Sequence, residues 1–165
     1  MQEPLSMWRV ELIHPSVVHI PVALLLIGTI LWLSSLFLHK RYSFLRPASR
    51  LMIFIGVIGA WIAVYTGLLA DGQVARSLCD PTVAKDHERF AYTVGYLFSA
   101  FVVVDWLAKK SYLNFLDIKY LRTGLAILLI SGCGFLGYVG HLGGKLVYQQ
   151  SAAVYQPTQG CVEFN

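Results

Sequence analysis

The chain has 165 residues, 56% of them hydrophobic and 13% charged, with a formal net charge of +4 at pH 7. Soluble domains carry about 25% charged residues, so this composition excludes an ordinary soluble domain and favours a protein embedded in lipid. The basic residues form no continuous run and no stripe with interleaved aromatic residues, so we expect no nucleic-acid partner. The length fits one domain, residues 1–165.

Four apolar runs follow one another along the chain, at 19–38, 51–70, 90–108 and 123–140. Each reaches the length of about 20 apolar residues that a helix needs to cross the hydrocarbon core. The first run is too long for a signal peptide and no cleavage site follows it. We predict helices at about 13–38, 48–71, 86–109 and 121–148. The expected fold class is an all-α integral membrane four-helix bundle in contact with lipid.

The charges between the runs predict the orientation. Connections 39–50 and 109–122 are rich in Lys and Arg, whereas the termini and connection 71–89 hold most of the acids. The positive-inside rule therefore places both termini, including a short C-terminal tail, on the extracytoplasmic side. Pro15 is expected in the first turn of the first helix, and Asp86 is expected to cap the third. We expect connection 71–89 to form a small lid, and we find no internal repeat.

The cysteines follow the same topology. Cys79 and Cys161 both fall on the predicted outer side, where an oxidising compartment permits a disulfide. We predict a bridge that pins the tail over the second connection; two unrelated thiols are the alternative. Cys133 lies in the middle of the fourth helix and is expected to be a small packing residue.

Four histidines lie at the predicted outer ends of three helices: His14, His19, His87 and His141. Ionisable residues in membrane segments are costly and usually functional, and neutral imidazole is a common metal ligand. His14 and His19 are five positions apart, which is about 140° around a helix. They are therefore expected to reach different partners. All four are candidate ligands of haem iron, and a hydrogen-bonding cluster is the structural alternative.

Glycines of the fourth helix, including Gly137, Gly140 and Gly144, leave room for a flat macrocycle beside His141. The alternative is a helix–helix contact, which small residues also favour in lipid. Arg89 is a candidate partner for haem propionates, together with Arg76 and Lys145. Three tyrosines are candidates to line the ring: Tyr65, Tyr92 and Tyr138.

Two motifs carry a resemblance that covers nearly the whole chain. HPSVVHIPVALL at residues 14–25 and GHLGGKLVY at residues 140–148 resemble a bacterial family of predicted membrane proteins, domain of unknown function 2231. The stretch from Gly59 to Asp71 and the histidine at 87 also match. The family often has a further histidine after the closing tyrosine, where this chain has Gln149, Gln150 and Ser151.

The resemblance implies a multi-pass protein of the bacterial inner membrane. Because members resemble redox-associated modules, some joined to cytochrome c-like or Rieske-like domains, it also favours haem over zinc. Fold-level analogy leaves function to be argued from the site.

These observations favour a b-type cytochrome-like subunit that carries electrons through one or two haem b groups near the periplasmic face. A c-type cytochrome is the expected redox partner, and an electron-transfer subunit is favoured over a stand-alone enzyme. One histidine of the first helix would pair with His87 and the other with His141, in an order the sequence leaves open. The alternative is an accessory subunit of a larger redox or pigment-binding complex. A transporter is disfavoured, because the only charged residue within the runs is Asp105.

Overall fold

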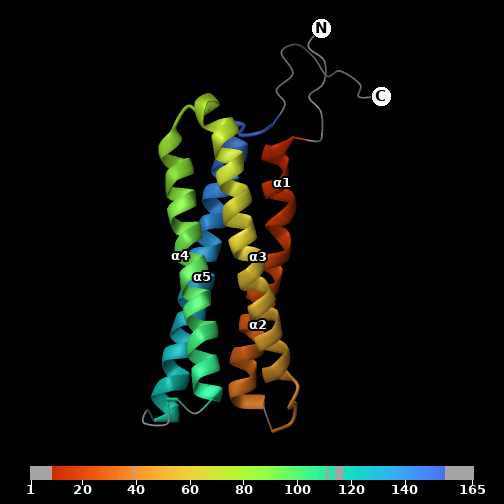
Figure 1. Ribbon diagram of the computed structural model, residues 1–165, viewed down its shortest axis with the longest axis vertical. Coiled ribbons are helices and arrows are strands. Elements are labelled where there is room, and N and C mark those ends of the chain that lie inside the picture. The colour runs from red at the N-terminus through yellow and green to blue at the C-terminus, as the bar shows by residue number, and fades with distance from the viewer. Residues whose placement is uncertain (1–8, 39, 111, 114–116, 155–165) are drawn as a thin grey trace, which may run out of the picture.

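The computed structural model describes residues 9–38, 40–110, 112–113 and 117–154, and its regular structure is helical. The elements are α1 (Val10–Val17), α2 (His19–Leu38), α3 (Leu45–Val74), the short 3-10 helix η1 (Ala75–Ser77), α4 (Pro81–Lys109) and α5 (Ile118–Gln150). They form a bundle of four long rods, because α1 and α2 follow one another as a single rod (Figure 1). All four rods are long and apolar enough to span a membrane, as the sequence predicts.

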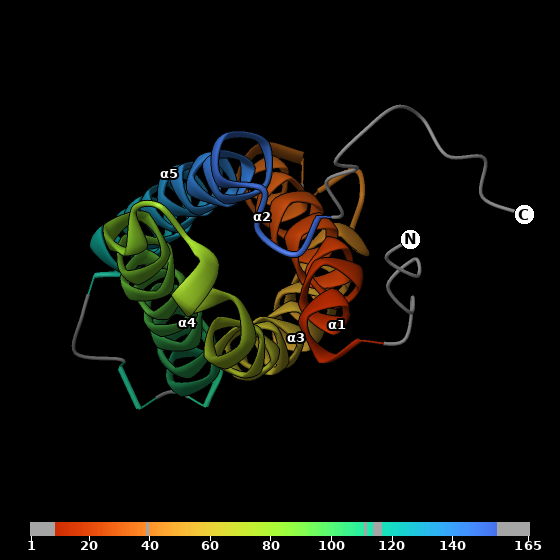
Figure 2. The same ribbon diagram turned by 90° about the horizontal axis from the view of Figure 1, so that it is seen from above.

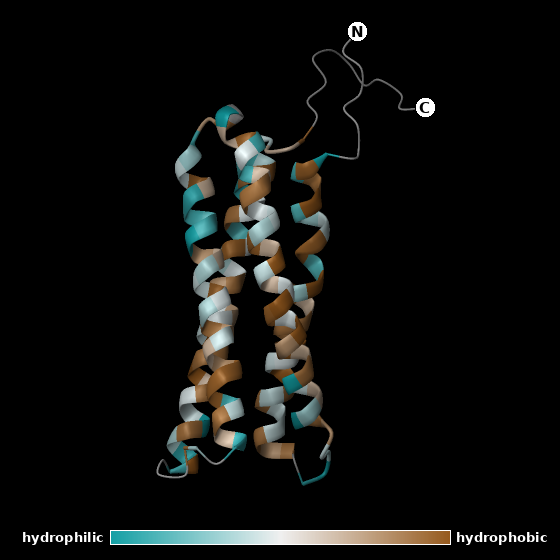
Figure 3. Ribbon diagram, in the orientation of Figure 1, coloured by the Kyte–Doolittle hydropathy of each residue, from teal (hydrophilic) through white to brown (hydrophobic). Residues whose placement is uncertain are grey.

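The bundle has two distinct ends. At the histidine end, where α1 begins and α5 finishes, Arg9 Nη2 donates to the carbonyl oxygen of Ala153 at 3.2 Å. The first and last described segments therefore meet at one end (Figure 1). The opposite end, here the arginine end, holds the connections after α2 and α4. Hydrophilic residues gather at both ends and apolar residues fill the middle (Figure 3). The side of the membrane that each end faces remains a prediction.

The first rod is interrupted at Val18, between α1 and α2. Pro15 lies inside α1 rather than in its first turn, because the helix begins at Val10. Pro21 has no N–H to donate to the carbonyl oxygen of Val17, so one helical hydrogen bond is missing there. The bonds on either side persist, since Val18 N–H donates to His14 at 3.1 Å and Val22 N–H donates to Val18 at 3.2 Å.

The second connection is much shorter than expected. The helix α4 begins at Pro81, and the side chain of Asp80 caps it by accepting the Thr82 N–H at 2.9 Å. Asp86 lies within α4, so the predicted cap is wrong. Between α3 and α4 only η1 and Leu78–Asp80 remain, and Leu78 is buried. The pKa of Asp80 lies below its ordinary value because the Thr82 hydroxyl and N–H stabilise the carboxylate.

The bundle consists of two helical hairpins, as the view along its axis shows (Figure 2). The first hairpin comprises α1, α2 and α3, and the second comprises α4 and α5. Their shared core contains the large buried side chains of both: Leu25, Trp32, Ile53, Phe98, Phe101 and Leu129.

The two hairpins pack internally in the same way. Leu25 lies against Gly56, where an added Cβ would be 2.8 Å from the leucine Cδ2. Phe98 lies against Gly132, where an added Cβ would be 2.7 Å from the phenylalanine Cε2. Leu25 and Phe98 are 73 positions apart, and Gly56 and Gly132 are 76 positions apart. The chain therefore has an internal structural repeat, and the expectation of none is wrong.

Candidate ligand cavity between the two hairpins

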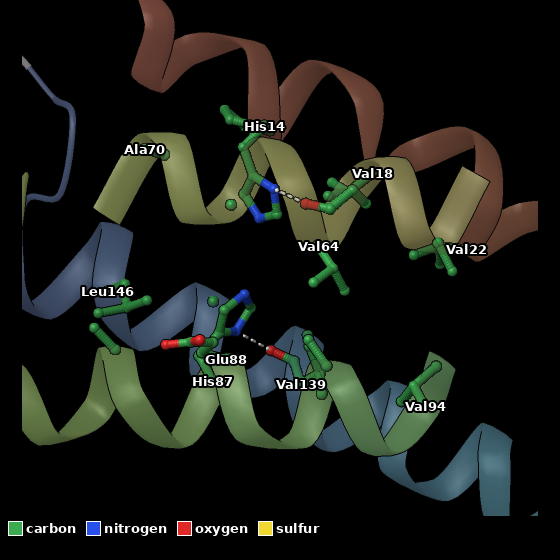
Figure 4. A pocket seen from close by; sticks show the side chains of 18 of the residues that line it. His14, Val18, Val22, Val64, Ala70, His87, Glu88, Val94, Val139 and Leu146 are labelled. Atoms are coloured by element: carbon green, nitrogen blue, oxygen red, sulfur yellow. Dashed lines mark hydrogen bonds between the residues drawn. The ribbon is translucent and has the colours of Figure 1, made fainter. Parts of the chain in front are cut away.

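A cavity of about 570 Å³ lies between the hairpins toward the histidine end. Its wall is mainly apolar and contains many small residues: Ala60, Ala63, Gly67, Ala91, Gly137 and Gly140. Ligand pockets in proteins typically enclose about 300–1,000 Å³ and combine apolar walls with a few placed polar groups. The polar groups deepest in this wall are two imidazoles, one from each hairpin (Figure 4).

The first imidazole belongs to His14 on α1. Its Nδ1 lies 2.9 Å from the carbonyl oxygen of Ala63 and 3.4 Å from the hydroxyl of Thr66, both on α3. The ring lies against Gly67, where an added Cβ would be 3.2 Å from the histidine Cε1. A glycine at this position therefore gives the ring the space it occupies.

The second imidazole belongs to His87 on α4 and repeats the arrangement. Its Nδ1 lies 3.0 Å from the carbonyl oxygen of Val139 on α5. An added Cβ at Gly143 would be 3.3 Å from the His87 Cε1. In each hairpin the accepting carbonyl stands four positions before the glycine. The two histidines are 73 positions apart and the two glycines are 76 positions apart, so the site follows the internal repeat.

The two rings face one another across the cavity. Their centroids are 6.0 Å apart and their planes are perpendicular. A carbonyl oxygen can only accept, so each Nδ1 carries the proton and each Nε2 keeps a free lone pair. The Nε2 atom of each ring points toward the other ring (Figure 4). This is the tautomer and orientation that metal-binding histidines receive from a backbone partner.

The other two candidate histidines lie elsewhere. His19, the first residue of α2, is exposed, and so is His141 on α5. Neither lines the cavity. His14 and His19 therefore do reach different surroundings, as their spacing predicts. Bringing one histidine of the first helix to His87 agrees with the sequence analysis, whereas a second pair with His141 does not form in the structure.

The expected macrocycle wall and propionate partners are met only in part. Gly137 and Gly140 line the cavity and have open space where a Cβ would be, but Gly144 does not line it. Arg89 is exposed and lies outside the wall. The remaining basic and aromatic candidates are also outside the wall: Arg76, Lys145, Tyr65, Tyr92 and Tyr138.

Charged residues that the sequence analysis passed over stand at this end. The carboxylates of Glu11, Asp71 and Glu88 belong to the cavity wall. Arg9 pairs with Glu11 at 3.0 Å, and its buried Nε has no hydrogen-bond partner. The cavity boundary includes Ala153, to which Arg9 donates, so this arginine is the basic side chain next to the wall.

The cysteines do not contribute to this site as a pair. Cys133 lies in the cavity wall at partial burial and Cys79 is an exposed free thiol. Cys161 is outside the described residues, so the bridge from Cys79 to Cys161 stays a prediction. Within the described ranges, no group of three or more His, Cys, Asp or Glu side chains is arranged to hold a metal ion.

The fold and cavity define a four-helix membrane protein with two opposed histidines between its hairpins. The model of the family described as predicted membrane protein (DUF2231) matches residues 11–156. The chain belongs to this family, as its histidine and glycine motifs indicate. Comparisons with curated proteins and with solved structures give no match.

Proposed function

We propose that the cavity holds one haem b, with His14 and His87 as its two axial ligands, and that the protein is an electron-carrying membrane subunit. The observation that carries this proposal is the opposed pair of imidazoles, each with its Nδ1 fixed by a backbone carbonyl. Two histidines alone do not complete an ordinary protein metal site, which takes three or four protein ligands. A haem supplies its own equatorial nitrogens and needs only axial ligands from the protein.

The distance between the rings supports a shared ion. A bond from a metal ion to an imidazole nitrogen is about 2 Å, so an ion held between two imidazoles sets their ring centroids about 6 Å apart. The centroids of His14 and His87 are 6.0 Å apart. The small residues on both sides leave a space of about 570 Å³ around this axis. The structure favours one haem rather than two, because it brings together one histidine pair.

The chain's own residues would orient the ligand and keep water away. The Ala63 and Val139 carbonyls hold the Nδ1 protons, which raises the basicity of the opposite nitrogens. The apolar wall lowers the local polarity, and burial of this kind tunes a haem potential. The unpaired Nε of Arg9 is the donor available to a carboxylate of the ligand, in place of the expected Arg89. A bound haem would supply one-electron chemistry.

The location and the partner follow from charge. We place the histidine end on the extracytoplasmic side of a bacterial inner membrane, because the Lys- and Arg-rich connections are at the other end. Glu11, Asp71 and Glu88 give the cavity boundary an acidic character. Complementary charge steers redox partners together, so a basic c-type cytochrome suits this end.

A reduced-minus-oxidised visible spectrum of the detergent-purified chain tests the proposal. Bands of a low-spin b-type haem, with about one haem for each chain by pyridine haemochrome assay, are the expected result. A colourless protein from a haem-supplemented culture would contradict it. That outcome leaves the accessory-subunit alternative, in which the cavity holds another apolar ligand.

A further inference from the structure

A second group of charged residues lies at the arginine end of the bundle. Arg50 of α3 forms a bidentate ion pair with Asp105 of α4, with Nε to Oδ2 at 2.6 Å and Nη2 to Oδ1 at 3.1 Å. Arg46 and Arg122 are within electrostatic range of each other and of this pair. The described ion pairs include no acid for either of them. The interior of this end therefore has three guanidinium groups and one carboxylate.

Arg46 and Arg122 hold equivalent places in the two hairpins. They are 76 positions apart, the spacing that relates Gly56 to Gly132. The internal repeat that brings two histidines together at one end thus brings two arginines together at the other. Their neighbours on the partner helices, Trp32 and Asp105, are likewise related by the 73-position spacing.

Donors without acceptors surround this position. The indole Nε1 of Trp32 is buried without a hydrogen-bond partner, and Trp32 is fully buried. The Arg46 guanidinium lies 5.3 Å from the Trp32 ring centroid, and its Nε also lacks a partner. The buried Thr29 hydroxyl, one turn before Trp32, is a third polar atom without one. Buried donors are almost always satisfied in proteins, so these atoms call for an acceptor that the chain does not supply.

We propose that the arginine end binds a phosphate-class anion between Arg46 and Arg122, with Trp32 as an additional donor. The planar guanidinium fork matches phosphate oxygens and forms two parallel hydrogen bonds with them. Asp105 neutralises Arg50 and leaves the other two arginines to the anion. Basic pockets between membrane helices take anionic lipid headgroups in this way. The same chemistry would also take free phosphate, so the test separates the two sources.

The test measures thermal unfolding of the full chain in nanodiscs of zwitterionic phosphatidylcholine. One arm adds increasing fractions of phosphatidylglycerol, and the other adds inorganic phosphate against sodium chloride of equal ionic strength. A rise in the melting temperature in the lipid arm alone identifies a headgroup, and a rise in the phosphate arm identifies a free anion. Loss of a hydrogen-bonded charge predicts that Arg46→Gln and Arg122→Gln each raise the half-maximal concentration about tenfold or more.

Lys119→Gln is the matched control, because it removes one exposed positive charge at the same end. It should leave the response unchanged. Arg122→Lys keeps the charge but removes the fork, and it should weaken the response while the bundle still folds. The proposal is overturned if neither arm stabilises the wild type, or if the arginine variants respond as Lys119→Gln does. Haem content is not needed for any of these readouts, so failure here is separate from failure of the haem proposal.

Discussion

The glycines beside the two histidines provide a sharp test of the cavity geometry. An added Cβ at Gly143 would lie 3.3 Å from His87 Cε1, and one at Gly67 would lie 3.2 Å from His14 Cε1. Carbon atoms pack at about 3.5–4.0 Å, so each imidazole would have to shift by a few tenths of an ångström. That shift acts on the 2.9 Å and 3.0 Å hydrogen bonds that fix the two Nδ1 atoms.

Loss of such orienting partners lowers metal affinity by about 10–100-fold. We therefore expect Gly67→Ala and Gly143→Ala each to lower haem affinity by a factor in this range, measured by haem titration of the apoprotein. Gly134→Ala is the control, because it lies on α5 with open space around its Cβ and outside the cavity wall. Unchanged affinity in both cavity variants, or equal loss in Gly134→Ala, would refute the assignment.

Three further outcomes follow from the contacts. Asp105→Asn leaves Arg50 without its partner, and partial exposure of the arginine reduces the cost to about 2 kcal/mol, seen as a lower melting temperature; an unchanged melting temperature would argue against the ion pair. Gly132→Ala places a Cβ 2.7 Å from the Phe98 ring and should cost about 1–3 kcal/mol, whereas Gly124→Ala, with nothing near it, should cost none. Haem should be released as the pH falls, because protonation of Nε2 removes the lone pair that binds iron; an acid titration of the visible spectrum that shows no release would oppose histidine ligation.

The bundle was predictable because lipid imposes long apolar helices, and each predicted helix is present. Their ends were predicted too short where polar residues remain helical. Asp71 lies within α3 and Asp86 lies within α4. Hydropathy marks the part of a helix that crosses hydrocarbon and gives no signal for the turns beyond it, whereas Asp80 followed by Pro81 is the local sequence that starts α4.

The site was predictable in depth but not in direction. Four histidines at one level could be read from the sequence, and the 140° between His14 and His19 correctly separated them. Which residue of each helix faces the interior depends on how the hairpins pack. On α5 the wall passes through Gly140 and Gly143, so His141, about 100° from Gly140, points elsewhere.

A signal for the repeat was present in the glycines. Gly56 and Gly67 are eleven positions apart, as are Gly132 and Gly143. Each pair has the same two roles, close approach in the core and space beside a histidine. The spacing alone carries little information, because the residues between the glycines differ and small residues are common in membrane helices. The contacts across each hairpin give it meaning.

The most direct test of the central claim compares four histidine variants by haem content and visible spectrum. His14→Ala and His87→Ala should lose haem or its low-spin bands, because each removes one of the two opposed imidazoles. His19→Ala and His141→Ala should keep both, because these side chains are exposed and outside the cavity. Haem binding that survives in His14→Ala and His87→Ala, or that is lost in His19→Ala and His141→Ala, would contradict the account.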